Sequence, residues 1–200
     1  VHGHKAMIYT GQCFAAETAG LGEGDSFFSV SKLFHSYGFG NALTFPLWLG
    51  GTCILSDRRV SPEMAFEVIE QLRPTIFFGV PTLYAQQLQH LETASPDTSS
   101  VRLCISAGEA LPGDVFRRWH DKTGIMILDG LGSTEALHVF IGNTVDTHKP
   151  GSSGRVVPRY EIRLVDEDGS PVAQGEIGTV HVRGGSTAKY YWNNSEKTAA

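Results

Sequence analysis

The amino-acid sequence predicts an α/β fold, in which a parallel sheet is flanked by helices and followed by a small antiparallel β subdomain. Short apolar segments alternate about four times with segments of helical periodicity. Strands that are apolar on both faces are typical of a parallel sheet covered by helices. After about position 148, apolar and polar residues alternate instead, which is typical of antiparallel strands. We therefore expect two partial subdomains, residues 1–147 and residues 148–200.

The first four elements are expected to be a helix, a strand, a helix and a strand. Apolar residues recur at near-helical spacing over 3–20, where closely spaced glycines end the helix. A short apolar strand is predicted at 26–30 and a helix at 38–49, which a pair of glycines ends. The second strand is predicted at 52–55.

The next helix has a clear beginning. Ser61 can cap it, Pro62 suits its first position and Glu63 favours its positive end. Its apolar face continues until Arg73. The later elements are expected to be strand 75–79, helix 81–90, strand 101–106, helix 112–123, strand 125–128 and two antiparallel strands at 160–165 and 176–183.

Composition excludes two classes of function. The chain has 16 basic and 21 acidic residues, a formal net charge of −5, and no basic stripe, so we do not expect it to bind nucleic acid. No apolar run reaches ~18 residues, so no membrane span is expected. Three cysteines lie in apolar segments without metal-ligand spacing, and no secretory signal is visible. Both features favour reduced thiols and a cytoplasmic protein.

Three segments that follow predicted strands could carry chemistry. They are 34–38, 106–110 and 129–135. Because ligands bind beyond the carboxyl ends of the strands in an open parallel sheet, all three should open onto one edge. Their glycines allow backbone amides to approach a phosphate or a flat ring, and Glu135 offers a carboxylate to a metal ion. The usual phosphate-loop, dinucleotide, serine-elbow and zinc-pair motifs do not occur in the sequence.

Taken in order, these segments resemble the adenylate-forming ligase superfamily, which includes acyl- and aryl-CoA synthetases. Residues 129–135, Asp-Gly-Leu-Gly-Ser-Thr-Glu, are similar to the G-x-[GS]-x-T-E stretch of that family. Residues 106–112 resemble its GGE-x-L box. Residues 175–178 and 190–198 resemble its G-E-[IL] … G-Y-[WL] … T segment.

Within the superfamily, 32–41 and 133–140 look like the benzoate and 4-hydroxybenzoate–CoA ligase branch, and the aliphatic Leu131 is similar to that branch too. The resemblance implies an ATP-dependent enzyme that activates benzoate or a substituted benzoate to an aryl-adenylate and then transfers the aryl group to CoA. It implies ATP or AMP and Mg²⁺ as cofactors and CoA as a co-substrate. The implied partners are these small molecules and an aryl carboxylate.

The resemblance also implies roles for individual residues. Thr134 would hydrogen-bond the α-phosphate, and Glu135 would hold Mg²⁺. His35 would lie near the reacting carboxylate as a gate or charge partner. The backbone of Ala107, Gly108, Glu109 and Ala110 would form one wall of the adenine slot, and Asp129, Gly130 and Leu131 would form the other. The aryl group would lie in a flat pocket lined by Ser36, Tyr37, Gly132 and His138.

Simpler interpretations stay open for several of these residues. Thr134 and Glu135 could cap a helix and supply the acid of its first turn. His35, Tyr37 and His138 could be ordinary buried side chains. Two other functions also stay open: an adenylation domain that loads an aryl acid onto a carrier-protein thiol, and a non-catalytic nucleotide-binding module.

By the same resemblance, the family's phosphate loop should lie upstream of Val1, and its ribose-binding aspartate and C-terminal lysine beyond Ala200. The chain is therefore expected to be an internal fragment of a larger domain and to have no measurable ligase turnover of its own. Truncation through a sheet would expose apolar faces, so a homodimer is also an expectation.

Overall fold

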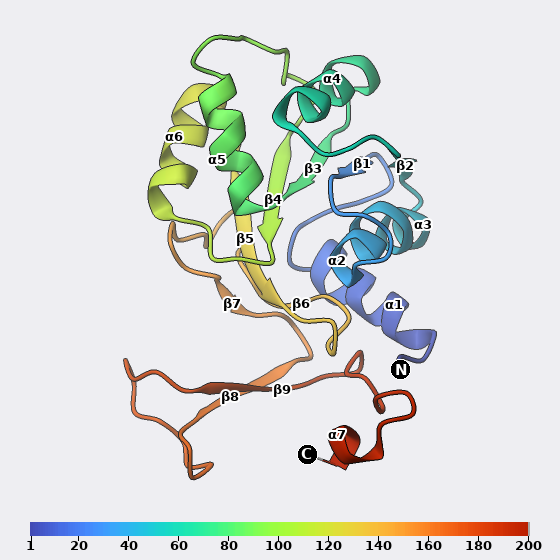
Figure 1. Ribbon diagram of the computed structural model, residues 1–200, viewed down its shortest axis with the longest axis vertical. Coiled ribbons are helices and arrows are strands. Elements are labelled where there is room, and N and C mark those ends of the chain that lie inside the picture. The colour runs from blue at the N-terminus through green and yellow to red at the C-terminus, as the bar shows by residue number, and fades with distance from the viewer. Residues whose placement is uncertain (200) are drawn as a thin grey trace.

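The structure is a computed structural model that describes residues 1–199, with one seven-stranded sheet and one two-stranded sheet (Figure 1). The strands are β1 (Ser26–Ser29), β2 (Thr52–Ile54), β3 (Ile76–Gly79), β4 (Leu103–Ala107), β5 (Ile127–Gly132), β6 (Val139–Gly142), β7 (Arg155–Val156), β8 (Glu161–Val165) and β9 (Thr179–Arg183). The helices are α1 (Lys5–Thr10), α2 (Ser36–Phe39), α3 (Phe45–Leu49), α4 (Pro62–Leu72), α5 (Pro81–His90), α6 (Gly113–Thr123), α7 (Ser195–Ala199) and the π-helical segments η1 (Gly11–Ala16) and η2 (Gly40–Thr44).

The centre of the large sheet is parallel. Its strand order is β2-β1-β3-β4-β5-β6-β7, and the first five strands in that order pair in parallel. β6 and β7 add antiparallel strands beside β5, while β8 and β9 form a separate antiparallel pair. The predicted fold class is therefore confirmed.

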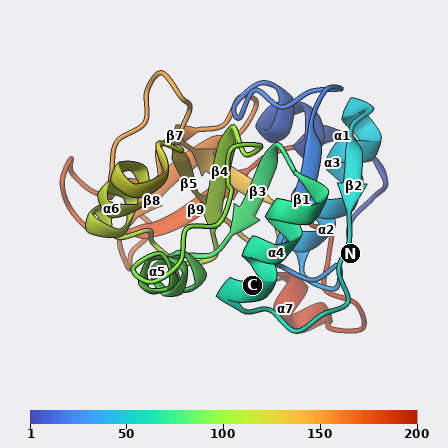
Figure 2. The same cartoon turned by 90° about the horizontal axis from the view of Figure 1, so that it is seen from above.

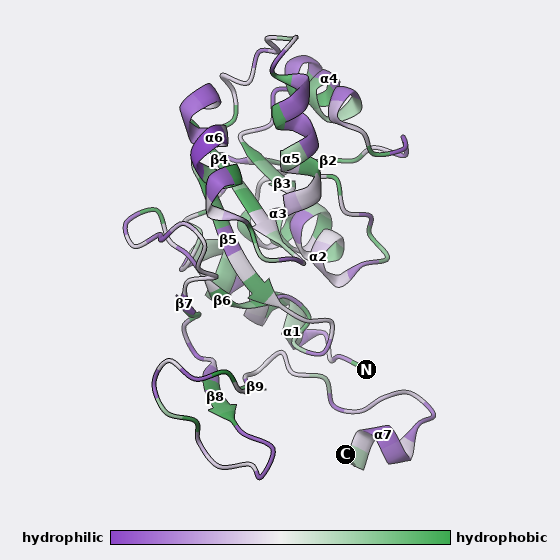
Figure 3. Ribbon diagram, turned by 60° about the vertical axis from the view of Figure 1, so that its left-hand side comes forward, coloured by the Kyte–Doolittle hydropathy of each residue, from purple (hydrophilic) through white to green (hydrophobic). Residues whose placement is uncertain are grey.

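Helices cover both faces of the large sheet (Figure 2). On one face, α4, α5 and α6 contribute to a buried apolar cluster that includes Phe77 and Trp119. On the other face, η1 and α3 contribute to a second cluster that includes Phe14, Phe45 and Phe78. Neighbouring residues of β3 thus point into opposite cores, as the pleat of a strand requires. The central strands are hydrophobic, whereas the outer surface of α6 is hydrophilic (Figure 3).

α4 begins as its sequence signals predict. The Ser61 hydroxyl accepts a hydrogen bond from the Met64 amide at 3.2 Å, and Pro62 occupies the first turn of α4. Gly124 ends α6 with a φ of 72°, a left-handed conformation that glycine adopts without strain. Among residues 1–199, no helix combines the length and apolar character needed to cross a membrane.

Two helices differ from their predicted bounds. The first runs from Lys5 to Ala16 rather than over 3–20, because the chain after Ala16 turns back towards β1. The second begins at Ser36, before the predicted position 38, and continues through η2 and α3 to Leu49. Both π-helical segments begin at a glycine, and the extra residue in each changes which side chains face the sheet.

The last parallel strand also differs from its predicted bounds, 125–128. β5 extends to Gly132 because β6 pairs with Gly130, Leu131 and Gly132. Most of the segment expected as a loop after this strand is therefore part of the strand. β6 and β7 are short and were not assigned from the sequence.

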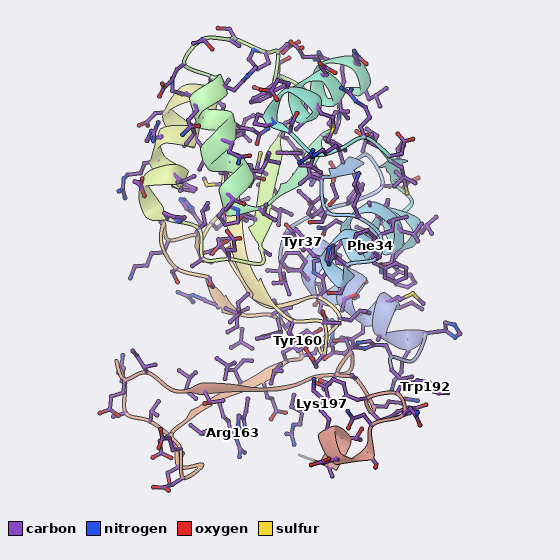
Figure 4. The ribbon with its side chains drawn as sticks, in the orientation of Figure 1. Phe34, Tyr37, Tyr160, Arg163, Trp192 and Lys197 are labelled. Carbon is purple, nitrogen blue, oxygen red and sulfur yellow. The ribbon has the colours of Figure 1, made fainter. Side chains whose placement is uncertain are left out.

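The β8–β9 hairpin joins the main body near Tyr160 (Figure 4). The Tyr160 ring lies edge-on to that of Tyr9, with 5.3 Å between the ring centroids. The Ser186 hydroxyl donates to the Ala136 carbonyl at 2.7 Å and lies 2.5 Å from the Tyr160 hydroxyl. Tyr160 is thus the donor to Ser186, since the proton of Ser186 is already committed. The division at 147/148 stays a prediction, although β7, which lies beyond it, pairs within the large sheet.

Candidate active site

A cavity of about 330 Å³ lies where the parallel strands end, and we call it the edge cavity. The three segments predicted to carry chemistry all contribute to it, which fits their expected position at one edge of the sheet. The residues that line it are Ser31, His35, Ser36, Tyr37, Val80, Ala107, Gly108, Gly132, Ser133, Thr134, His138 and Val139.

One wall of the edge cavity is aromatic. The rings of Tyr37 and His138 are stacked, with centroids 5.4 Å apart and planes 30° apart. Phe45 contacts His138 edge-on at 4.5 Å. The Tyr37 hydroxyl lies 3.2 Å from the Ile105 carbonyl, which holds the ring beside β4. Tyr37 lies close to the sheet, whereas Phe34 projects from the loop before α2 (Figure 4). Such a wall suits a flat aromatic ligand.

His138 is an uncharged part of that wall. Its side chain is buried, with a residue exposure of 3%, and its Nε2 lies 3.0 Å from Oδ1 of Asn41. Burial lowers the pKa of His138 to about 3, because the imidazolium would lose its hydration. At neutral pH the ring therefore offers a flat surface and no positive charge for a carboxylate.

Thr134 and Glu135 lie in the turn between β5 and β6. No helix of the described chain begins at this turn, so the helix-cap interpretation of the two residues is wrong. The Ser133 hydroxyl accepts from the Ala136 amide at 3.1 Å, and the Nε2 atom of His2 lies 2.8 Å from the Thr134 carbonyl. The turn is thus held by contacts from within and from the start of the chain, while the exposed Thr134 side chain lies at the edge cavity.

Glu135 lies next to the edge cavity rather than in its lining. Its Oε1 accepts a hydrogen bond of 2.8 Å from the Tyr191 hydroxyl, and this bond lowers the pKa of the carboxyl group. Glu135 is therefore ionised at neutral pH. Within residues 1–199, no three His, Cys, Asp or Glu side chains gather as a metal site. Any cation at Glu135 would thus have fewer than three such ligands from the described part of the chain.

The two predicted walls of the adenine slot are neighbours in the sheet. Ala107 at the end of β4 pairs with Gly130 of β5. Paired strands lie only ~4.8 Å apart, so a ring has room only beyond this pair, near the exposed Gly108, Glu109, Ala110 and Leu131. Of these residues, Gly108 has a φ of 94°, and a Cβ there would have no neighbour within 4 Å, so its backbone is open to a ligand.

Asp129 lies away from the edge cavity. It is inside β5, and its side chain reaches the α6 face of the sheet, where it lines a separate small space with Leu111 and Phe116. Its exposure is 7%, and burial raises its pKa to about 6. The pleat of β5 explains this direction, because residues on either side of Asp129 face the other way.

Some residues of the site were not predicted. Asn41 is fully buried and touches His138, and its spacing of four from Tyr37 on a helix was an available signal. His2 and Tyr191 contact the turn from the two ends of the described chain. No local pattern indicates contacts between segments so far apart.

Residues 1–192 match the family described as AMP-binding enzyme. The chain belongs to this family. The match confirms the resemblance that the motifs at 106–112 and 129–135 indicate.

Among AMP-binding enzymes, the chain is 47% identical over 201 residues to the benzoate–CoA ligase of Thauera aromatica, covering 100% of this chain and 38% of that protein. It is 41% identical over 187 residues to the 4-hydroxybenzoate–CoA/benzoate–CoA ligase of Rhodopseudomonas palustris, covering 92% and 34%. The crystal structure of the anthranilate CoA ligase AuaEII in complex with anthranoyl-AMP superimposes with a TM-score of 0.96 at 41% identity, covering 98% and 38%. The chain thus spans little more than a third of the length of these relatives.

Proposed function

We propose that the protein carrying this chain is an AMP-forming aryl-CoA ligase that activates benzoate or a substituted benzoate. The observation that supports this most is the edge cavity, in which an uncharged aromatic wall of Tyr37 and His138 adjoins the Thr134 turn. A volume of about 330 Å³ is at the small end of ligand pockets and suits a single-ring acid. The relatives named above, with benzoate and anthranilate among their substrates, support the same substrate class.

The neutral wall determines how an aryl acid would lie. His138 has no positive charge to offer at neutral pH, so the ring of the substrate belongs against Tyr37 and His138. The carboxylate then points away from this wall, towards the turn that carries Thr134. His35, which is exposed and lines the edge cavity, is the residue we expect at the entrance.

In the proposed reaction, a carboxylate oxygen of the substrate bonds to the α-phosphorus of ATP, and the bond to the bridging oxygen breaks, releasing pyrophosphate. The sulfur of CoA then bonds to the carbonyl carbon, its proton is lost, and AMP leaves. Thr134 would donate its hydroxyl proton to the α-phosphate, which must accept charge in the first step. The open backbone at Gly108 and the exposed Leu131 would contact the adenine.

The donor set at the turn fits Mg²⁺. This ion is held in many enzymes by one or two carboxylates together with substrate phosphates and water, and Glu135 supplies one ionised carboxylate beside the edge cavity. When bound, Mg²⁺ would neutralise charge on the phosphates. Glu135 would hold it, and Thr134 would orient the same phosphate group.

Benzoate-dependent exchange of labelled pyrophosphate into ATP tests the first half-reaction, and thioester formation with CoA tests the second. We expect both from the protein carrying this chain and neither from the 200-residue polypeptide alone. Glu135→Gln should reduce exchange by roughly 100-fold or more, because the metal ligand is lost. Glu167→Gln, in the exposed turn of the hairpin, is the matched control and should leave exchange unchanged.

The outcomes separate the alternatives. Exchange without transfer to CoA would favour a carrier-protein thiol as the acceptor. Binding of ATP without exchange for any benzoate would favour a non-catalytic nucleotide-binding module and overturn the proposal.

A further inference from the structure

The side chains of Glu135 and Tyr191 meet although the residues are 56 positions apart. The Tyr191 hydroxyl donates to Oε1 of Glu135 at 2.8 Å. We propose that Tyr191 is a positioning residue that orients the Glu135 carboxylate for Mg²⁺. The inference rests on the proposed function, because it assumes the metal-binding role of Glu135.

The geometry leaves the carboxylate able to bind a cation. A carboxylate has two oxygens with about four lone-pair positions, and the Tyr191 hydroxyl occupies one of them. A tyrosine hydroxyl is neutral and donates a single proton, so it fixes the carboxylate without neutralising it. An arginine or lysine at the same place would compete with the metal ion for the negative charge.

Tyr191 is itself held in place. Its amide donates to the Thr198 hydroxyl at 2.9 Å, and the ammonium group of Lys197 lies 4.3 Å from the centroid of its ring. Lys197 and Trp192 both lie on the C-terminal segment, below the main body (Figure 4). Because the ring is fixed from its backbone and from its face, its hydroxyl has a defined position.

The same segment also fixes the backbone of Glu135. The amide of Ala188 donates to the Glu135 carbonyl at 2.6 Å. Glu135 is therefore tied to the segment 188–198 through its main chain and its side chain. The side-chain bond acts on the carboxylate itself, so its removal should affect metal binding more than the path of the turn.

Tyr191→Phe tests the proposal in the protein that carries this chain. It removes the hydroxyl and keeps the ring over which Lys197 lies. The probe is Mn²⁺, whose binding to protein saturated with α,β-methylene-ATP is followed by the loss of the free-ion electron paramagnetic resonance signal. We expect Mn²⁺ binding to weaken roughly 10-fold, the lower end of the range for loss of a partner that orients a metal ligand. The half-saturating Mg²⁺ concentration for pyrophosphate exchange should rise by a similar factor.

The matched control is Tyr190→Phe. Tyr190 precedes Tyr191, is 41% exposed, and contributes its carbonyl rather than its hydroxyl to a described hydrogen bond. This variant should bind Mn²⁺ as the unmodified protein does. Binding of the nucleotide in EDTA reports on the structure of the site without a metal ion. It should be equal in all variants, because loss of carboxylate orientation affects only the metal ion. A structural defect would weaken it.

Three results of these binding measurements would overturn the inference. Unchanged Mn²⁺ affinity in Tyr191→Phe, with a clear loss in Glu135→Gln, would overturn the inference and leave the proposed function intact. Unchanged affinity in both variants would contradict the metal-binding role of Glu135 and thus the proposed function as well. Weakened nucleotide binding in EDTA for Tyr191→Phe alone would assign Tyr191 a structural role and would also overturn the inference.

Discussion

Asn41 and His138 form a buried polar pair behind the aromatic wall, with Oδ1 of Asn41 3.0 Å from Nε2 of His138. A carboxamide oxygen only accepts, so Nε2 carries a proton and the neutral ring has its unprotonated nitrogen at Nδ1. Asn41→Leu should remove this partner and leave the Nε2 proton without an acceptor. We expect the free energy of unfolding to fall by about 1–3 kcal/mol. Urea denaturation measures it, and Gln89→Leu on the exposed face of α5 should change it by less than ~0.5 kcal/mol.

Gly40→Ala should disturb the same wall from the other side. A Cβ at this position would come within 2.5 Å of Cδ2 of His138, in a region where Phe45 leaves little room. We expect a loss of about 1–3 kcal/mol of stability from overpacking, together with weaker binding of benzoate in equilibrium titrations. Gly22→Ala is the control, because a Cβ there would have no neighbour within 4 Å. If both substitutions lower the free energy of unfolding by the same amount, the close contact between Gly40 and His138 is not the cause of the loss.

His138 should make stability depend on pH. Its pKa is about 3 in the folded protein and 6.5 when unperturbed, so between these values the unfolded state binds one more proton. The contribution of neutral His138 to the stability of the fold is therefore complete above pH 6.5. It is lost as the pH falls from 6.5 to about 3, by about 1.4 kcal/mol per pH unit. We expect the difference in unfolding free energy between the unmodified protein and His138→Phe to grow from pH 4 to pH 6 and to be constant above pH 7. A constant difference over the whole range would mean that the folded protein accepts a proton at His138 as readily as the unfolded chain.

Asp129 should have the opposite effect. Burial raises its pKa to about 6 from 3.8, so between these values the folded state binds one more proton. Its contribution to stability is complete below pH 3.8 and is lost as the pH rises to 6, again by about 1.4 kcal/mol per unit. Asp129→Asn should therefore gain stability relative to the unmodified protein over this interval, with a constant difference above pH 7. Between pH 4 and pH 6 the two residues change the free energy of unfolding in opposite directions. When one of them is replaced, urea denaturation at several pH values should show the pH dependence that the other one causes.

Much of the fold could be predicted from the sequence because its signals are local. Fully apolar strands such as β3 and a capped helix such as α4 carry their periodicity and their stop signals within a few residues. β7 has two residues, too short for a period to be recognised. β6 is as long as β3, but it pairs antiparallel with β5 across a turn, which the alternation of strands and helices gave no reason to expect. The end of β5 depends on β6 as its partner, so an error in one strand produced the error in the other.

Only part of the candidate site could be predicted from the sequence, because local signals can be recognised there and tertiary contacts cannot. The segments at the strand ends come together because a parallel sheet aligns its carboxyl ends, and eight of the predicted site residues line the edge cavity. They are His35, Ser36, Tyr37, Ala107, Gly108, Gly132, Thr134 and His138. The resemblance implies that Asp129 forms part of a wall of the adenine slot, whereas the pleat of β5 directs its side chain to the α6 face. Tyr191 contacts Glu135 only through a tertiary arrangement that no local pattern encodes.

The turn that carries Thr134 and Glu135 is bonded to the two ends of the described chain: Nε2 of His2 lies 2.8 Å from the Thr134 carbonyl, and the Ala188 amide donates to the Glu135 carbonyl at 2.6 Å. This has a consequence for the order of assembly on the ribosome. At ~5–20 residues per second, roughly 10–40 s pass between synthesis of residue 1 and residue 189. The parallel sheet and the Tyr37–His138 wall can form during that interval, but the carboxylate of Glu135 must wait for Tyr191. A nascent chain would thus acquire the proposed surface for an aromatic ring well before the proposed ligand for a cation is fixed.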